Sequence, residues 1–87
     1  MDNRKFMQVA VKAVTDYHNA TNDAACDKIT EDDVFIVWAC KTIGNNKAML
    51  ATDVRDGMYY EFTWNGAKNE GYLAAYKKCA NVVVTAD

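Results

Sequence analysis

The first regular hydrophobic pattern in the chain runs from Asn3 to Asn19. Its apolar residues recur at i, i+3, i+4, i+7, i+8 and i+11, namely Phe6, Val9, Ala10, Ala13, Val14 and Tyr17. This spacing predicts one amphipathic helix over about 3–20. The helix is expected to end between Asn19 and Asp23, where Asn, Thr and Asp favour local side-chain bonds to the backbone. A polar connector over 21–33 follows.

The middle of the chain has the pattern of three short strands. Val34–Cys40 is an unbroken apolar run, which suits a strand buried on both faces. Lys47–Thr52 is a second, short strand, and Met58–Trp64 alternates apolar and polar positions as a third. Gly44-Asn45-Asn46 and Asp56-Gly57 supply the turns. The expected structure over 34–66 is a three-stranded antiparallel meander.

Beyond Ala67 the pattern reads as helical again. Its apolar residues fall on one helical stripe, and Lys77 and Lys78 lie outside this stripe. The stripe consists of Tyr72, Leu73, Tyr76, Cys79 and Ala80. We therefore predict a C-terminal helix over about 68–81 and an extended tail over 82–87, in which three valines could add to a sheet edge. The predicted fold is a single small α+β domain over 1–87, in the order α-β-β-β-α, with the meander packed against two helices.

The apolar strand at Val34–Cys40 raises the question of what covers its second face. Strict alternation points Phe35, Val37 and Ala39 one way, and Ile36, Trp38 and Cys40 the other. If both helices cover one face of the sheet, the other keeps large side chains typical of interface anchors. The candidate partner or dimer surface consists of Ile36, Trp38, Cys40 and Tyr59. If the helices instead cover one face each, these large side chains are buried within the domain and no partner surface remains.

Composition narrows the chemistry that the chain can perform. The 87 residues include neither serine nor proline, and His18 is the single imidazole. A nucleophile would have to be a cysteine or threonine with no evident base beside it. The carboxylate groups at Glu31-Asp32-Asp33 and at Asp53 with Asp56 fit a solvated loop and a turn. The sequence therefore predicts a protein without catalytic activity and without a cofactor.

A zinc site is suggested by count and opposed by spacing. One histidine and three cysteines match a Cys₃His set: His18, Cys26, Cys40 and Cys79. No two of them lie two to four residues apart, as the ligands of structural zinc sites usually do. An odd number of cysteines without a paired motif is also typical of reduced thiols in an intracellular protein. We expect no metal site.

Nucleic-acid binding is the alternative function. The element order α-β-β-β-α matches that of the double-stranded RNA-binding domain, and aromatic residues beside lysines could stack bases. The candidate contacts are Lys41, Lys47, Lys68, Lys77 and Lys78. The formal net charge of −2 does not provide the basic field that phosphate binding uses. Protein binding is therefore preferred.

Several strings in the last two thirds of the chain occur together in one known group of proteins. They are Asp32-Asp33-Val34-Phe35-Ile36-Val37-Trp38, Cys40-Lys41-Thr42, Asn46-Lys47-Ala48, Asp56-Gly57-Met58-Tyr59-Tyr60-Glu61, Asn65-Gly66, Lys68-Asn69-Glu70 and Ala75-Tyr76-Lys77-Lys78. The chain in this way resembles a small family of uncharacterised proteins from phages and prophages of Gram-positive bacteria. The resemblance implies a protein of the host cytoplasm, made during infection or lysogeny, that binds a host or phage protein. No segment is long and apolar enough to suggest a membrane span.

Overall fold

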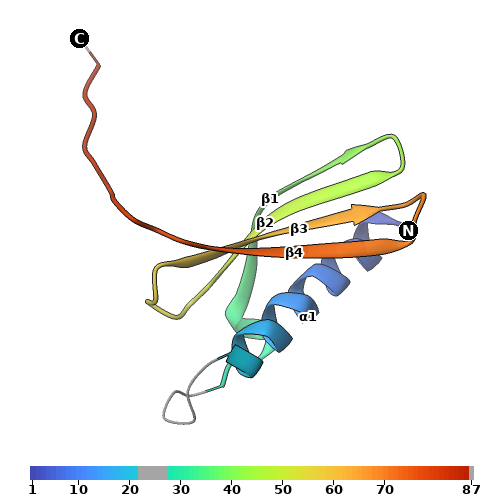
Figure 1. Cartoon of the computed structure of the whole chain (residues 1–87), viewed down its shortest axis with the longest axis horizontal. Coiled ribbons are helices and arrows are strands. Elements are labelled where there is room, and N and C mark those ends of the chain that lie inside the picture. Colours follow the sequence, from blue (N-terminus) through green and yellow to red (C-terminus); the bar gives the residue numbers. More distant parts are fainter. Residues whose placement is uncertain (22–27, 87) are drawn as a thin grey trace.

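The computed structural model describes residues 1–21 and 28–86, with one open antiparallel sheet and one long helix (Figure 1). The sheet order β1-β2-β3-β4 follows the chain, so every neighbouring pair is joined by a short turn. This architecture belongs to the α+β class. The elements in chain order are α1 (Asn3–Thr21), the 3-10 turn η1 (Glu31–Asp33), β1 (Val34–Thr42), β2 (Asn45–Thr52), β3 (Met58–Asn65) and β4 (Glu70–Lys77).

Helix α1 lies on one face of the sheet and forms the core with it. Asp2 precedes the helix, and its carboxylate accepts a hydrogen bond from the backbone N–H of Lys5 at 2.7 Å, which satisfies one of the free N–H groups of the first turn. The buried stripe of α1 includes Phe6, Ala10 and Val14 at a spacing of four residues. Phe6 packs on Phe62 of β3 with ring centroids 5.8 Å apart.

The sheet contributes the other half of the core from alternate positions of its strands. Ala48 and Leu50 of β2 and Tyr60 and Phe62 of β3 are buried under the helix. Each large apolar side chain buried in this way stabilises the fold by about 1.5–3 kcal/mol. Burial also raises the pKa of the Tyr60 phenol, and nearby Asp56 adds to that shift, so the phenol stays neutral in the core.

The segment predicted as a second helix is a strand. Residues Glu70–Lys77 form β4, which pairs with β3 throughout its length, from Asn65 opposite Glu70 to Met58 opposite Lys77. Alternation places Leu73 and Ala75 on the side of α1, and pairing with β3 gives the backbone of β4 its hydrogen bonds. The expectation of three strands and two helices is therefore wrong in its last element. The described residues also lack the C-terminal helix of the double-stranded RNA-binding order.

A β-bulge in β1 corrects the predicted faces of that strand. Ile36 pairs with Leu50, but Trp38 pairs with Met49, so Val37 is the extra residue between them. Leu50 and Met49 are neighbours and point to opposite faces of β2. Ile36 therefore points towards α1 and packs against the core, whereas Trp38 points away from the helix. The prediction that Ile36 and Trp38 share one face is wrong.

The chain beyond β4 runs away from the sheet (Figure 1). The backbone N–H of Lys78 still donates to the carbonyl of Gly57 at 2.7 Å, and the described residues from Lys78 to Ala86 are all exposed. Val82, Val83 and Val84 lie in this tail. In the part of the chain described here, no helix combines the length and apolarity needed to cross a membrane.

Candidate functional site

The sheet has one face that α1 does not cover, and we call it the open face. The pairing register assigns alternate residues of each strand to it, with Asn45, Asn65 and Glu70 at one end and three residues of each strand in its main part. The residues of the main part are Phe35, Trp38 and Cys40 of β1, Lys47, Met49 and Ala51 of β2, Tyr59, Glu61 and Thr63 of β3, and Tyr72, Ala74 and Tyr76 of β4. Within the described residues this face has no covering layer (Figure 1).

The open face is rich in exposed aromatic rings. Phe35 and Tyr72 are each 48% exposed, and Trp38 and Tyr76 are each 42% exposed. Tyr59 stacks on Tyr76 across β3 and β4, with ring centroids 5.1 Å apart and an interplanar angle of 13°. Large apolar side chains that gather in one exposed patch mark an interaction site, whereas apolar residues scattered singly over a surface do not. The rings also come from β1, β3 and β4, so the feature spans the sheet.

The polar groups of the open face largely satisfy one another. Lys47 Nζ lies 3.3 Å from Glu61 Oε1, and this ion pair joins β2 to β3 in the middle of the face. The hydroxyl of Tyr72 donates to Glu70 Oε2 at 2.5 Å. That hydrogen bond to a carboxylate is the main cause of a raised pKa at Tyr72, so its phenol remains a donor well into the alkaline range. The face therefore has little net charge.

Three of the four residues predicted for a partner surface lie on the open face. Trp38, Cys40 and Tyr59 share it, whereas Ile36 lies on the covered side because of the bulge. Sequence reasoning missed Phe35, Tyr72 and Tyr76. The tyrosines were assigned to a helical stripe, although their spacing of four residues also fits one face of a strand.

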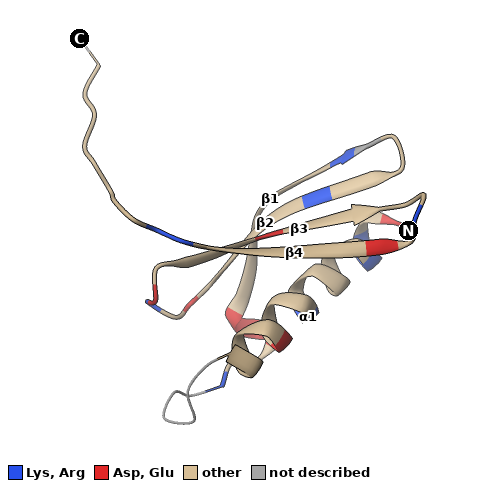
Figure 2. Ribbon diagram, viewed as in Figure 1, with Lys and Arg blue, Asp and Glu red and all other residues tan. Residues whose placement is uncertain are grey.

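The five lysines proposed for nucleic-acid binding do not form one cluster (Figure 2). Lys41 and Lys68 lie near the turns at one end of the sheet, and Lys77 and Lys78 lie at the opposite end of β4. Lys47 is the one lysine of the set within the open face, and Glu61 neutralises it. Phosphate binding depends on several cations acting together, and this arrangement separates them.

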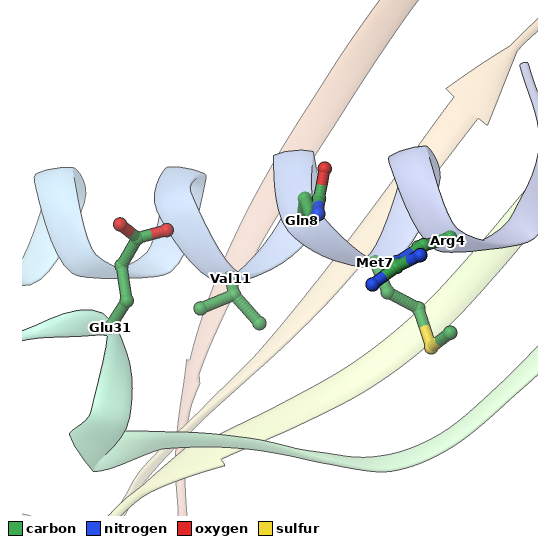
Figure 3. A pocket seen from close by; sticks show the side chains of 5 residues that line it. All are labelled: Arg4, Met7, Gln8, Val11 and Glu31. Atoms are coloured by element: carbon green, nitrogen blue, oxygen red, sulfur yellow. The ribbon is translucent and has the colours of Figure 1, made fainter.

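A shallow groove lies on the flank of α1. It has a volume of about 310 Å³ and is lined by Arg4, Met7, Gln8, Val11 and Glu31. Figure 3 shows Glu31 at one end and Arg4 at the other, with Met7 beside Arg4 and Val11 between the two charged residues. The lining thus combines apolar carbon with two separated, opposite charges.

Those residues of the Cys₃His set that the structure describes lie on separate segments of the fold. His18 is buried in α1, Cys40 is exposed on β1, and Cys79 is exposed beyond β4. Cys26 lies outside the described residues. Among the residues that the structure does describe, no three His, Cys, Asp or Glu side chains are grouped so that they could hold a metal ion.

Fold and open face together define a class of small α+β proteins in which one helix covers one side of a four-stranded meander. The sequence places the chain in a family within that description. The model of the Family of unknown function (DUF6275) matches residues 7–86, so the chain belongs to this family. Comparison with curated proteins and with solved structures gave no match.

Proposed function

We propose that this protein acts without catalysis, by binding another protein through the open face of its sheet. The observation that carries the proposal is the set of aromatic rings left 42–48% exposed on the face opposite α1. Trp and Tyr are the side chains that most often dominate the free energy of protein interfaces. These rings are already more than half-buried, so a partner that covers the remaining 42–48% gains from each less than the roughly 1.5–3 kcal/mol of a fully buried side chain, and several rings have to act together to offset the cost of association.

The chemistry of the face indicates the kind of partner. Its centre holds one cation and one anion, Lys47 and Glu61, already paired with each other. A strongly charged ligand would have to break this pair, whereas a neutral, apolar protein surface leaves it intact. We therefore infer a partner that presents apolar side chains with few charges.

The resemblance to phage and prophage proteins of Gram-positive bacteria supplies the biological setting of the proposal. In that setting the protein is an accessory protein of the host cytoplasm, and its partner is a host or phage protein. A small domain with one large apolar face suits this role, because it can cover part of a larger protein without an active site of its own.

Single-stranded nucleic acid is the second candidate, favoured by the stacked rings of Tyr59 and Tyr76 on an open sheet. Bases stack on such platforms, each contributing about 1–3 kcal/mol. The separated lysines oppose it, because single-stranded binding also relies on a positively charged groove.

Affinity recovery with the full chain from a Gram-positive host lysate, with and without nuclease, tests the proposal. We expect a protein that is retained after nuclease treatment and lost with Trp38→Ala or Tyr76→Ala. Ile43→Ala is the matched control, since Ile43 is a fully exposed apolar residue in the turn between β1 and β2. Release by nuclease would favour the nucleic-acid candidate. Retention unchanged by both face variants, or no retained protein, would overturn protein binding through this face.

A further inference from the structure

Strand β4 is an edge of the sheet, and the direction of its backbone groups can be read from one hydrogen bond. The N–H of Lys78 donates to the carbonyl of Gly57 in line with the β3–β4 register. Residues in antiparallel strands alternate between pairs that exchange hydrogen bonds and pairs that do not. The even-numbered residues from Glu70 to Lys78 therefore direct their N–H and C=O groups to β3. The odd-numbered residues direct theirs outward: Gly71, Leu73, Ala75 and Lys77.

These outward groups form a continuous template for another strand. The one hydrogen bond to them among the described residues is weak, from the Cys79 thiol to the Lys77 carbonyl at 3.8 Å. The opposite edge is less suitable, because the bulge at Val37 interrupts the regular geometry of β1. A strand that extends the sheet should therefore add to β4.

We propose that this strand is the β4 of a second copy, paired antiparallel about a two-fold axis at Ala74 to give one continuous eight-stranded sheet. The inference goes beyond the proposed function, because it concerns the edge of the sheet at β4 and leaves the open-face residues of β1, β2 and β3 uncovered. Two-fold pairing sets each residue opposite one from the same strand, so β4 must be complementary to itself.

Backbone geometry selects the register. With Ala74 at the axis, Gly71 lies opposite Lys77 of the partner subunit, and Leu73 lies opposite Ala75 of the partner subunit. All four outward residues then pair among themselves, and each such pair exchanges two N–H···O=C bonds. The register also keeps the two helices on the same side of the joined sheet. A shift of one residue in this pairing would place residues from opposite faces against each other.

Side-chain chemistry selects the same register. On the open face it places Glu70 opposite Lys78 of the partner subunit and Tyr72 opposite Tyr76 of the partner subunit, each twice. Figure 2 shows the acidic and basic colours at opposite ends of β4, as an antiparallel self-pair requires. The next registers that preserve the faces set Glu70 opposite Tyr76 or Tyr72 opposite Lys78, and both lose the charge pairs. Glu70 keeps Oε1 for this contact, because Tyr72 bonds to Oε2.

The helix side of β4 leaves room for the second copy. Helix α1 packs chiefly against β1, β2 and β3, so Leu73 and Ala75 are only half-buried. Pairing sets these apolar side chains beside their counterparts and extends the covered layer across the joint.

Light scattering and sedimentation equilibrium on the full chain test the dimer. At tens to hundreds of micromolar we expect a mass approaching twice 9.7 kDa. Glu70→Lys or Lys78→Glu alone turns two attractive pairs into repulsive ones and should raise the dissociation constant about tenfold. An equimolar mixture of the two variants should recover dimerisation, because each supplies the charges that the other needs. Lys68→Glu, in the turn before β4, is the control and should have no effect.

Ala75→Pro provides a second, backbone test. It removes an N–H that points outward, so it should abolish the dimer and leave the β3–β4 ladder intact, as unfolding followed by circular dichroism will show. A strictly monomeric chain would overturn the proposal, as would a dimer that tolerates both Glu70→Lys and Ala75→Pro. A dimer lost instead with Trp38→Ala would place self-association on the open face. Trp38→Ala should abolish partner binding and leave the dimer intact, so the two proposals can fail independently.

Discussion

At the scale of single residues, Asn19 links the end of the helix to the beginning of the sheet segment. Its side-chain amide donates to the carbonyl of Ile29 and accepts from the N–H of Ile29, both at 2.9 Å. One amide thus satisfies both backbone groups of a buried residue ten positions further on. The same asparagine lies where the sequence predicts the end of the helix, and the two observations give it a structural role.

Removing the Asn19 amide should destabilise the fold, although the side chain is small. We expect Asn19→Ala to lower the free energy of unfolding by about 1–3 kcal/mol, because the N–H and C=O of Ile29 lose their partners while they stay shielded from water. Urea unfolding followed by circular dichroism measures the change. Asn81→Ala, the same substitution in the exposed tail, is the control. Equal midpoints for the two variants would contradict the structural role of Asn19.

At the scale of elements, the sequence predicts a strand well where alternation is unambiguous. In β3, Tyr60 and Phe62 point into the core and Tyr59 and Glu61 point away, as the alternation predicts. In β4, Tyr72 and Tyr76 are four residues apart, a spacing that fits one stripe of a helix and one face of a strand alike. Pairing with β3, a long-range contact, decides between them. The bulge that turns Trp38 to the face opposite Ile36 likewise depends on pairing with β2, so the sequence of β1 alone does not predict it. Of the aromatic residues on the open face, the sequence therefore predicts Trp38 and Tyr59 and misses those whose face depends on strand pairing, namely Phe35, Tyr72 and Tyr76.

Gly71 shows how β3 and β4 fit together. A Cβ at this position would lie 2.5 Å from Cζ of Phe62 and 3.1 Å from Cε3 of Trp64, so the absent side chain makes room for two aromatic rings. Phe62 is buried and packs on Phe6, so a shift of its ring would disturb the core. The lack of a side chain at Gly71 thus allows β3 and β4 to pack closely at this point.

Filling that space should destabilise the fold. Gly71→Ala is expected to lower the free energy of unfolding by about 1–3 kcal/mol through overpacking, although alanine is ordinarily the better residue within a strand. A double-mutant cycle with Phe62→Leu identifies the cause, since the smaller side chain should remove most of the penalty. Additive effects of the two substitutions would show that the Phe62 ring is not the obstacle.

At the scale of the whole molecule, α1 is the one long helix of the described residues, and a sheet has two faces to cover. Nineteen helical residues span about 28 Å, which matches the roughly 26 Å length of eight-residue strands. Helix α1 can thus cover one face along its length and leaves nothing for the other. A chain that is 51% hydrophobic then places part of its apolar surface on the open face. The uncovered open face is the physical consequence of having one helix, in the described residues, where the sequence predicts two, and it is the surface to which we assign the proposed partner binding.

The apolar residues of the C-terminal tail, unlike those of the core, do not stabilise the fold by packing. Val82, Val83 and Val84 are exposed, and the hydrogen bonds that hold β4 on β3 end at Lys78. Truncation after Ala80 should therefore change the free energy of unfolding by less than about 0.5 kcal/mol, as for surface changes away from any packed feature. It should also leave the proposed β4 dimer intact and reduce aggregation, since three adjacent valines form a strand-prone segment. Chemical unfolding, sedimentation and turbidity measure these outcomes. A clear loss of stability would show instead that the valines dock on the body of the protein in solution.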